Sequence, residues 1–227
     1  LNSLDLSQCE IDDEGCRIIA KGLVNVIGRG PATKMEKAAM AFDEFGLKEL
    51  NVFGNAFGED GANALAPYSE VIGASVPGWR QDAKVLDVSG RGMVGGNVYI
   101  VGGILLPAMA ALEKLDLGKC GLDDKACAVL ANALPAVTGL KELNVFGNAF
   151  GEDGAKALAP RLPNSLETFK STKFQWSAGD TEAWHVSESE LGPGDIHIVA
   201  ALLQKVPTLK KLDLGKCGLD DKACAVL

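Results

Sequence analysis

Two segments of the chain are repeated within it, and this internal repetition constrains the fold more than any other feature. The stretch LDLGKCGLDDKACAVL occupies residues 115–130 and recurs unchanged at 212–227. A second stretch, LKELNVFGNAFGEDGA, occupies 47–62 and recurs at 140–155. Such copies indicate stacked structural units, because one unit alone cannot bury its hydrophobic face. The chain is therefore expected to form a solenoid.

Each unit is predicted to combine a short strand with a helix. Leu115 and Leu117 alternate toward one side, which is typical of a strand, and Leu122 turns the chain. The following stretch KACAVLANAL places Val129 and Leu130 on one helical face. Stacked units of this kind predict an α/β fold, with a curved parallel sheet on the concave face and helices on the convex face.

The pattern beneath both copies is L-x-x-L-x-L-x-x-(C/N)-x-(L/F), followed by a small-residue turn and a short helix. This is the leucine-rich-repeat signature, and the chain closely resembles the ribonuclease-inhibitor-like subfamily of these repeats. In that subfamily, units with Cys at the ninth position alternate with units that carry Asn there. The Cys type appears here as Cys9 with Cys16, Cys120 with Cys127 and Cys217 with Cys224, and the Asn type carries Asn55 and Asn148. The resemblance implies a leucine-rich-repeat horseshoe over nearly the whole chain.

Residues 1–227 read as a single domain of six units and a partial seventh. The units start at Leu1, Leu47, Ala83, Leu112, Leu140, Leu166 and Leu209. Arg91 and Phe174 take the Cys or Asn position in the third and sixth units, and an insertion follows at 175–194. An extra helix is predicted over 33–45. The chain stops inside an unfinished unit, so we expect a piece of a longer protein, with its open ends packed on missing repeats or on another chain.

A glycine-rich turn, GRGMVG at residues 90–95, matches the G-x-G-x-x-G pattern of dinucleotide-binding loops. In the repeat alignment this stretch is the ordinary strand-to-helix turn of the third unit, with Gly90 at the position of Lys119 and Gly92 at that of Gly121. A short glycine motif without its structural context is a weak signal. We therefore interpret the glycines as repeat turns and expect no cofactor.

Charge and cysteine spacing narrow the function further. The formal net charge is −8, whereas a nucleic-acid binder needs a basic surface. We therefore expect the chain to bind neither nucleic acid nor a membrane. We expect a protein partner, and the negative charge is compatible with a basic one. C-x6-C is not a zinc spacing, so the cysteines are interpreted as reduced, buried and structural, with no metal site. Free thiols indicate a reducing compartment, and we expect a cytoplasmic protein.

The residues between the inward leucines are predicted to face the concave surface. One row of them is mostly acidic or amide, and the next contains two phenylalanines, a residue type that often anchors partners. A tryptophan in the 175–194 insertion joins them as a candidate. The predicted partner-binding residues are Asp5, Asn51, Phe53, Asp87, Asp116, Asn144, Phe146, Asp213 and Trp184. The alternative is that the acids and amides are only solvated surface, and that the insertion is a solvated acidic loop pinned by one tryptophan in the core.

The leading interpretation is a non-catalytic protein-interaction scaffold or recognition domain. His185 and His197 lie in no arrangement with a nucleophile that would predict an enzyme. One alternative is a ribonuclease-inhibitor-like inhibitor that sets the acidic row against a basic enzyme. Another is a GTPase-activator-like regulator, for which Arg91 is the one arginine at the concave edge. These alternatives rest on analogy between folds.

Overall fold

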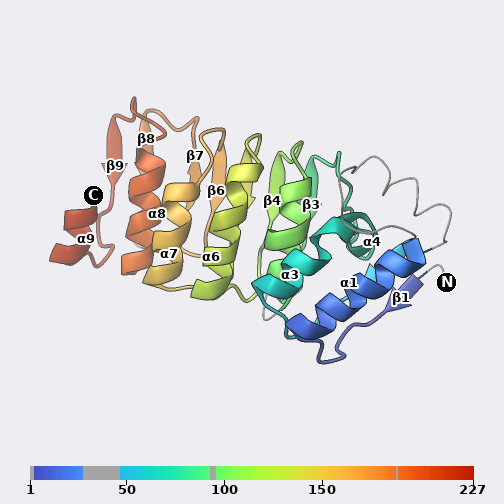
Figure 1. The fold of residues 1–227 in the computed structure, drawn as a ribbon. Coiled ribbons are helices and arrows are strands. Elements are labelled where there is room, and N and C mark those ends of the chain that lie inside the picture. Colours follow the sequence, from blue (N-terminus) through green and yellow to red (C-terminus); the bar gives the residue numbers. More distant parts are fainter. Residues whose placement is uncertain (1–2, 28–46, 93–95, 188) are drawn as a thin grey trace.

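The computed structural model describes residues 3–27, 47–92, 96–187 and 189–227. Short strands alternate with helices, and the helices stack along one side of the row of strands (Figure 1). The strands are β1 (Ser3–Asp5), β2 (Glu49–Asn51), β3 (Val85–Asp87), β4 (Lys114–Asp116), β5 (Glu142–Asn144), β6 (Thr168–Lys170), β7 (Gln175–Ser177), β8 (Ala183–His185) and β9 (Lys211–Asp213). The helix predicted over 33–45 lies outside the described residues.

The helices follow the strands in the predicted order. The α-helices are α1 (Asp13–Ile27), α3 (Glu59–Leu65), α4 (Ser69–Gly73), α5 (Gly96–Val98), α6 (Asp124–Ala133), α7 (Glu152–Leu158), α8 (Pro193–Leu203) and α9 (Asp221–Val226). The π-helical η2 (Tyr99–Leu105) continues α5, and short 3-10 turns are η1 (Ala66–Tyr68), η3 (Leu106–Ala108), η4 (Leu134–Ala136) and η5 (Ala159–Arg161).

Helix α6 illustrates how the local sequence sets where a helix begins and ends. Asp123 caps it by accepting the Ala126 N–H at 2.8 Å, and Pro135 in η4 stops the α-helical pattern.

The strands pair in three groups, namely β1 with β2, the five strands β3 to β7, and β8 with β9. Every pair is parallel except β6 with β7, which is antiparallel. The central residues of paired strands lie opposite one another and pack into the core: Leu4 with Leu50, then Leu86, Leu115, Leu143 and Phe169, then Trp184 with Leu212. The predicted leucine-rich-repeat solenoid, with its parallel sheet and helical side, is confirmed.

The turn after each strand explains the glycine-rich motif. Gly90, Lys119 and Lys216 occupy the same position in their units, and all three have left-handed backbone, with φ of 73°, 54° and 58°. The same repeat turn therefore occurs with and without glycine. It supports the reading of the GRGMVG stretch as a repeat turn, although residues 93–95 lie outside the described ranges.

The 175–194 stretch differs from the expected loop insertion. Its first part forms β7, which folds back on β6 as a hairpin, and its second part forms β8. Strand β8 pairs in parallel with β9 and carries Trp184 at the position that Leu115 holds in β4. The expected unit starting at Leu166 thus contains two strand positions of the solenoid, one at β6 and one at β8. The second position is hidden in the sequence because tryptophan stands there in place of leucine.

Candidate protein-binding face

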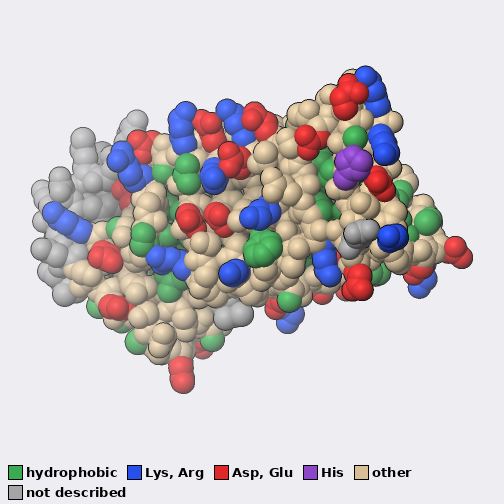
Figure 2. Space-filling view, turned by 180° about the vertical axis from the view of Figure 1, so that it is seen from behind, with side chains coloured by type: hydrophobic (Ala, Val, Ile, Leu, Met, Phe, Trp, Pro, Cys, Tyr) green, Lys and Arg blue, Asp and Glu red, His purple; other side chains and the backbone are tan. Residues whose placement is uncertain are grey.

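The outward side chains of the strands form the candidate site, which we call the concave face. Strand register places the predicted acids and amides in one row: Asp5 beside Asn51, then Asp87, Asp116 and Asn144, and finally Asp213. Two further residues belong to this row, Lys170 beside Asn144 and His185 beside Asp213. In the view from behind, charges of both signs gather over this side of the molecule (Figure 2). The strand alignment predicts Lys170 in this row, whereas His185 is an addition that the sequence placed in the insertion.

The acids and amides of the row have a structural task. Each places a side-chain oxygen on the backbone N–H two residues later, as Asp87 does with Ser89 at 2.9 Å and Asn144 with Phe146 at 2.9 Å. These bonds satisfy the backbone where the strand ends. Hydrogen bonds from Ser89 lower the pKa of Asp87 below its ordinary value, so this carboxylate stays charged. These hydrogen bonds support the alternative interpretation, in which the acids and amides are ordinary surface residues. The D-x-S and N-x-F spacing in the sequence is consistent with such bonds.

Several of these groups also bind one another. Asn144 donates to both carboxylate oxygens of Asp116, each at 3.0 Å. His185 Nδ1 lies 3.3 Å from Asp213 Oδ2. The N–H of Gly215, and after it His185, lower the pKa of Asp213. Asp116 and Asp213 consequently offer a partner fewer free carboxylate acceptor positions than the sequence suggests.

The two predicted phenylalanines lie at equivalent positions but differ in exposure. Phe146 is 36% exposed, and Lys170 Nζ lies 5.1 Å from its ring centroid, within cation–π distance. Phe53 is only partly exposed and packs against the core. Phe146 is therefore the better exposed anchor of the two.

Trp184 does not form part of the surface. Its side chain is 3% exposed, its indole N–H donates to the Gln175 carbonyl at 3.0 Å, and its ring meets Phe174 edge-on with centroids 5.8 Å apart. Because it fills the inward position of β8, its proposed contact with a partner is corrected. The alternative of a core tryptophan fits Trp176, which the repeat alignment places at the position of Leu122 and which is 2% exposed in β7.

The ninth-position residues tie neighbouring units together. Asn148 accepts the N–H groups of Cys120 and Leu122 at 3.0 Å and donates to the carbonyls of Leu117 and Val145 at 2.8 Å. Asn55 makes the corresponding four bonds between β1 and β2. The thiols of Cys120 and Cys217 donate to Val88 and Val186, carbonyls of the preceding units. These hydrogen bonds fix the turn of each unit against the neighbouring unit.

All six cysteines are free thiols, but burial of all six was wrong. Cys16, Cys120, Cys127 and Cys217 are buried, whereas Cys9 and Cys224 are exposed. Burial raises the pKa of Cys127 to about 12, with Asp124 and Asp123 adding to the effect. Cys9 and Cys224 lie in the first and last units, where no described residue covers the outer side.

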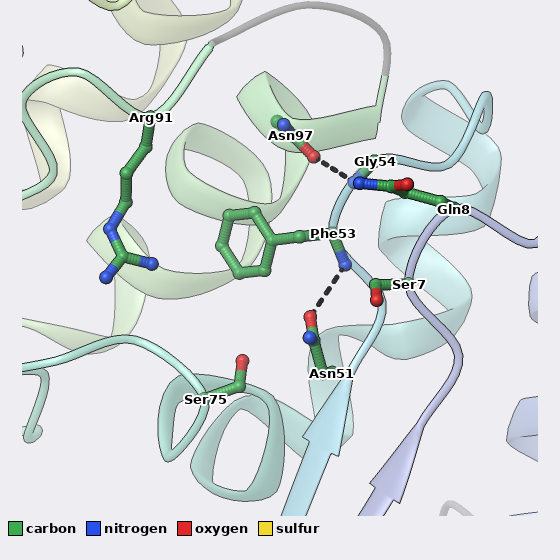
Figure 3. A pocket seen from close by; sticks show the side chains of 8 residues that line it. All are labelled: Ser7, Gln8, Asn51, Phe53, Gly54, Ser75, Arg91 and Asn97. Atoms are coloured by element: carbon green, nitrogen blue, oxygen red, sulfur yellow. Dashed lines mark hydrogen bonds between the residues drawn. The ribbon is translucent and has the colours of Figure 1, made fainter.

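A pocket opens on the concave face where β2 and β3 fail to pair. It has a volume of about 300 Å³ and joins two predicted residues, Asn51 and Phe53, to residues that were not predicted. The lining consists of Ser7, Gln8, Asn51, Phe53, Gly54, Ser75, Arg91 and Asn97. Arg91 and the Phe53 ring reach toward each other from facing sides of this space (Figure 3). The sequence signal for the pocket was the arginine at a ninth position, where Cys or Asn is the rule.

The parallel strands, the outer helices and the ninth-position bonds together define a leucine-rich-repeat solenoid. A model of the leucine rich repeat family matches residues 1–20, 47–66, 138–159 and 207–227. Ribonuclease inhibitor from Sus scrofa is 25% identical over 289 aligned residues, which cover 100% of this chain and 60% of that protein. The chain is a leucine-rich-repeat protein of the ribonuclease-inhibitor-like type.

Two further proteins are similar to this chain. Human NACHT, LRR and PYD domains-containing protein 13 is 27% identical over 165 residues, covering 73% of this chain and 13% of that protein. Among solved structures, the leiomodin-1 actin-binding site 2 aligns with a TM-score of 0.40 and 18% identity, over 68% of this chain and 78% of that one. This chain thus spans 60% of the first curated relative and 13% of the second, less than two thirds of either. Within the described ranges, no helix combines the length and the apolar character needed to cross a bilayer.

Proposed function

We propose that this chain is a non-catalytic protein-recognition domain that binds its partner on the concave face. The observation that carries the proposal is Phe146, an exposed aromatic ring on a short, regularly paired strand unit, with the Lys170 ammonium beside it. Exposed aromatics gain from burial against a partner, and a rigid scaffold lowers the entropy lost on binding. Asn51, Phe53, Asp5 and Asp87 complete the proposed face.

A second candidate is inhibition of a basic enzyme. The similar protein from Sus scrofa is a ribonuclease inhibitor, and the present chain has a formal net charge of −8. Opposite net charges speed association and make it dependent on salt. This candidate predicts that a small basic ribonuclease is bound and loses activity, with affinity falling as salt rises.

The domain is proposed to act in a reducing compartment such as the cytoplasm, as one unit extending over residues 1–227. The six free thiols support this, because oxidising compartments favour disulfides in cysteine-rich small proteins. Exposed Cys9 and Cys224 in particular are open to oxidation outside a reducing environment.

The test compares affinity for a captured partner among matched variants. Phe146→Ala and Lys170→Ala remove the exposed ring and its cation. Ile18→Ala removes a hydrophobic side chain that is more exposed than Phe146, at 60%, and lies on α1 of the opposite side. We expect Phe146→Ala to weaken binding by about 1–2 kcal/mol and Ile18→Ala to leave it unchanged. If Phe146→Ala and Lys170→Ala leave the affinity unchanged and Ile18→Ala lowers it, the partner binds the helical side and not the concave face.

A further inference from the structure

The break between β2 and β3 coincides with the loss of a ninth-position bond. In the described residues no backbone hydrogen bond joins these two strands, whereas β3 donates to β4 through Val88 N–H and Asp116 O at 3.0 Å. Asn, whose amide can both donate and accept, holds the turn elsewhere, but Arg91 cannot accept a hydrogen bond. Asn97 closes the gap on the helix side, accepting from Gly54 N–H at 2.6 Å and donating to Gly92 O at 2.7 Å.

The hydrogen-bonding groups around the resulting pocket are mostly occupied. Asn51 Oδ1 accepts the Phe53 N–H at 3.1 Å, and Ser75 Oγ donates to Ile72 O at 2.6 Å. The Arg91 guanidinium differs, since it makes no side-chain hydrogen bond or ion pair with any residue in the described ranges. Its side chain lines the pocket across from the Phe53 ring (Figure 3), and its five N–H groups are donors for which the described residues supply no acceptor.

The nearby carboxylate of Asp87 does not form an ion pair with Arg91. Asp87 accepts hydrogen bonds from Ser89, which are the main cause of its lowered pKa, and the charge of Arg91 is the smallest contribution. Among the ion pairs of the described residues, none joins Asp87 to Arg91, and only their charge interaction connects them. An arginine held beside an aromatic ring without a direct counter-ion is complementary to an anion that carries an apolar stem.

We infer that this pocket binds the carboxylate of a single Asp or Glu side chain presented by a protein partner. The guanidinium offers paired N–H donors to the two carboxylate oxygens, and the Phe53 ring packs against the methylene groups of the same side chain. The inference rests on the proposed function and specifies one contact of the proposed interface, between Arg91 and an acidic side chain of the partner. On a chain of net charge −8, it predicts that even a basic partner presents one acidic residue at this point.

The first experiment needs no partner protein. Backbone and arginine side-chain NMR signals of the whole chain are followed during titration with the peptide acetyl-Ala-Ala-Glu-Ala-Ala-amide, with its Gln analogue and with its phosphoserine analogue. We expect the Glu peptide to shift the Phe53 and Gly54 amide signals and the Arg91 Nε–H signal in a saturable way. The Gln peptide should bind about tenfold more weakly, because a charge-assisted hydrogen bond is replaced by a neutral one.

Two variants assign the effect to the pocket. Arg91→Gln should abolish the difference between the Glu and Gln peptides, and Arg91→Lys should keep part of it, since lysine retains the charge without the planar fork. Arg80→Gln is the matched control, because Arg80 is an exposed arginine that pairs with Asp82 at 3.0 Å and does not line the pocket. It should leave both titrations unchanged.

Equal binding of the Glu and Gln peptides would overturn the inference, as would a Glu-specific shift that survives Arg91→Gln. Saturable binding of the phosphoserine peptide alone would replace the carboxylate by a phosphate group and equally overturn it. These outcomes leave the concave-face function standing, because that function is tested by partner affinity with Phe146→Ala. Conversely, failure of that affinity test does not alter the peptide titration.

Discussion

The two copies of LDLGKCGLDDKACAVL have identical sequences and unequal burial. In the copy at 115–130, Leu115 is 1% exposed and Cys127 fully buried, whereas in the copy at 212–227 the equivalent Leu212 is half-buried and Cys224 exposed. The first copy lies between β3 and β5 and their helices. The second packs on β8 and α8, with no described residue on its far side. Burial in this solenoid is thus decided by neighbours.

The local hydrogen bonds, in contrast, are the same in both copies. Asp123 and Asp220 cap their helices by accepting the N–H of Ala126 and Ala223, each at 2.8 Å. The left-handed lysine recurs as well, with φ of 54° at Lys119 and 58° at Lys216. Strand ends, turns and caps therefore follow from the sixteen-letter sequence itself, while the tertiary environment does not.

The largest expected difference between the copies is thiol reactivity. At pH 8 under native conditions, Cys224 should react with a thiol reagent at least about 10³ times faster than Cys127, because burial withholds the thiolate form. The pKa of Cys127 is raised to about 12, against an ordinary value of 9.0. Mass spectrometry of labelled peptides gives both rates in one sample.

Denaturant is the control for this measurement, since both cysteines sit in the same local sequence and should then react alike. Exposed Cys9 should also label quickly in the native protein. Equal labelling rates for Cys127 and Cys224 in the native protein would mean that the two thiols are equally accessible, contrary to the structure.

The second difference concerns stability. Leu115→Ala should lower the free energy of unfolding by about 3 kcal/mol, because it removes a fully buried side chain and leaves a cavity between two neighbours. Leu212→Ala should cost about 1 kcal/mol, because Leu212 is already half-buried. Urea unfolding followed by circular dichroism measures both. If the two variants lose the same stability, an additional surface must cover Leu212 in solution.

A third difference appears in alkaline solution. In the unfolded chain the Cys127 thiol ionises near its ordinary pKa of 9.0, whereas in the folded chain the pKa is about 12. Between pH 9 and 11 the unfolded state therefore holds fewer protons, and stability falls as pH rises, by at most about 1.4 kcal/mol per pH unit for this thiol. Below pH 9 the effect vanishes.

Substitution tests the assignment of that slope. Cys127→Ala should flatten the dependence of the unfolding free energy on pH in this window, and Cys224→Ala, the same change in the exposed copy, should leave the slope as in the parent chain. A slope that persists fully in Cys127→Ala belongs to other groups, of which Cys16, with its pKa also raised to about 12 by burial, is the first to examine.

These contrasts also explain what the sequence could predict. The ninth-position roles of Asn55 and Cys120, and the row that holds Asp87 and Asp116, depend on short-range pattern and could be predicted. The burial of Trp184 could not, because a tryptophan at a leucine position, preceded by the β7 hairpin, breaks the spacing on which the alignment relied. The Arg91 pocket could be predicted only in part: the arginine at a ninth position marks the unit, but the pocket itself opens because β2 and β3 do not pair, which no local pattern encodes.

The smallest difference separates the two phenylalanines of the other repeated stretch. Phe53→Ala should lower the free energy of unfolding by about 1 kcal/mol, because its ring packs partly against the core, and Phe146→Ala by less than about 0.5 kcal/mol. Urea unfolding of the two variants against the parent chain is the measurement. Partner affinity should rank them in the opposite order if Phe146 is the more exposed anchor. Should Phe53→Ala change neither property, its ring would have no role in either the core or the face, and the pocket that it shares with Arg91 would have to bind through the guanidinium alone.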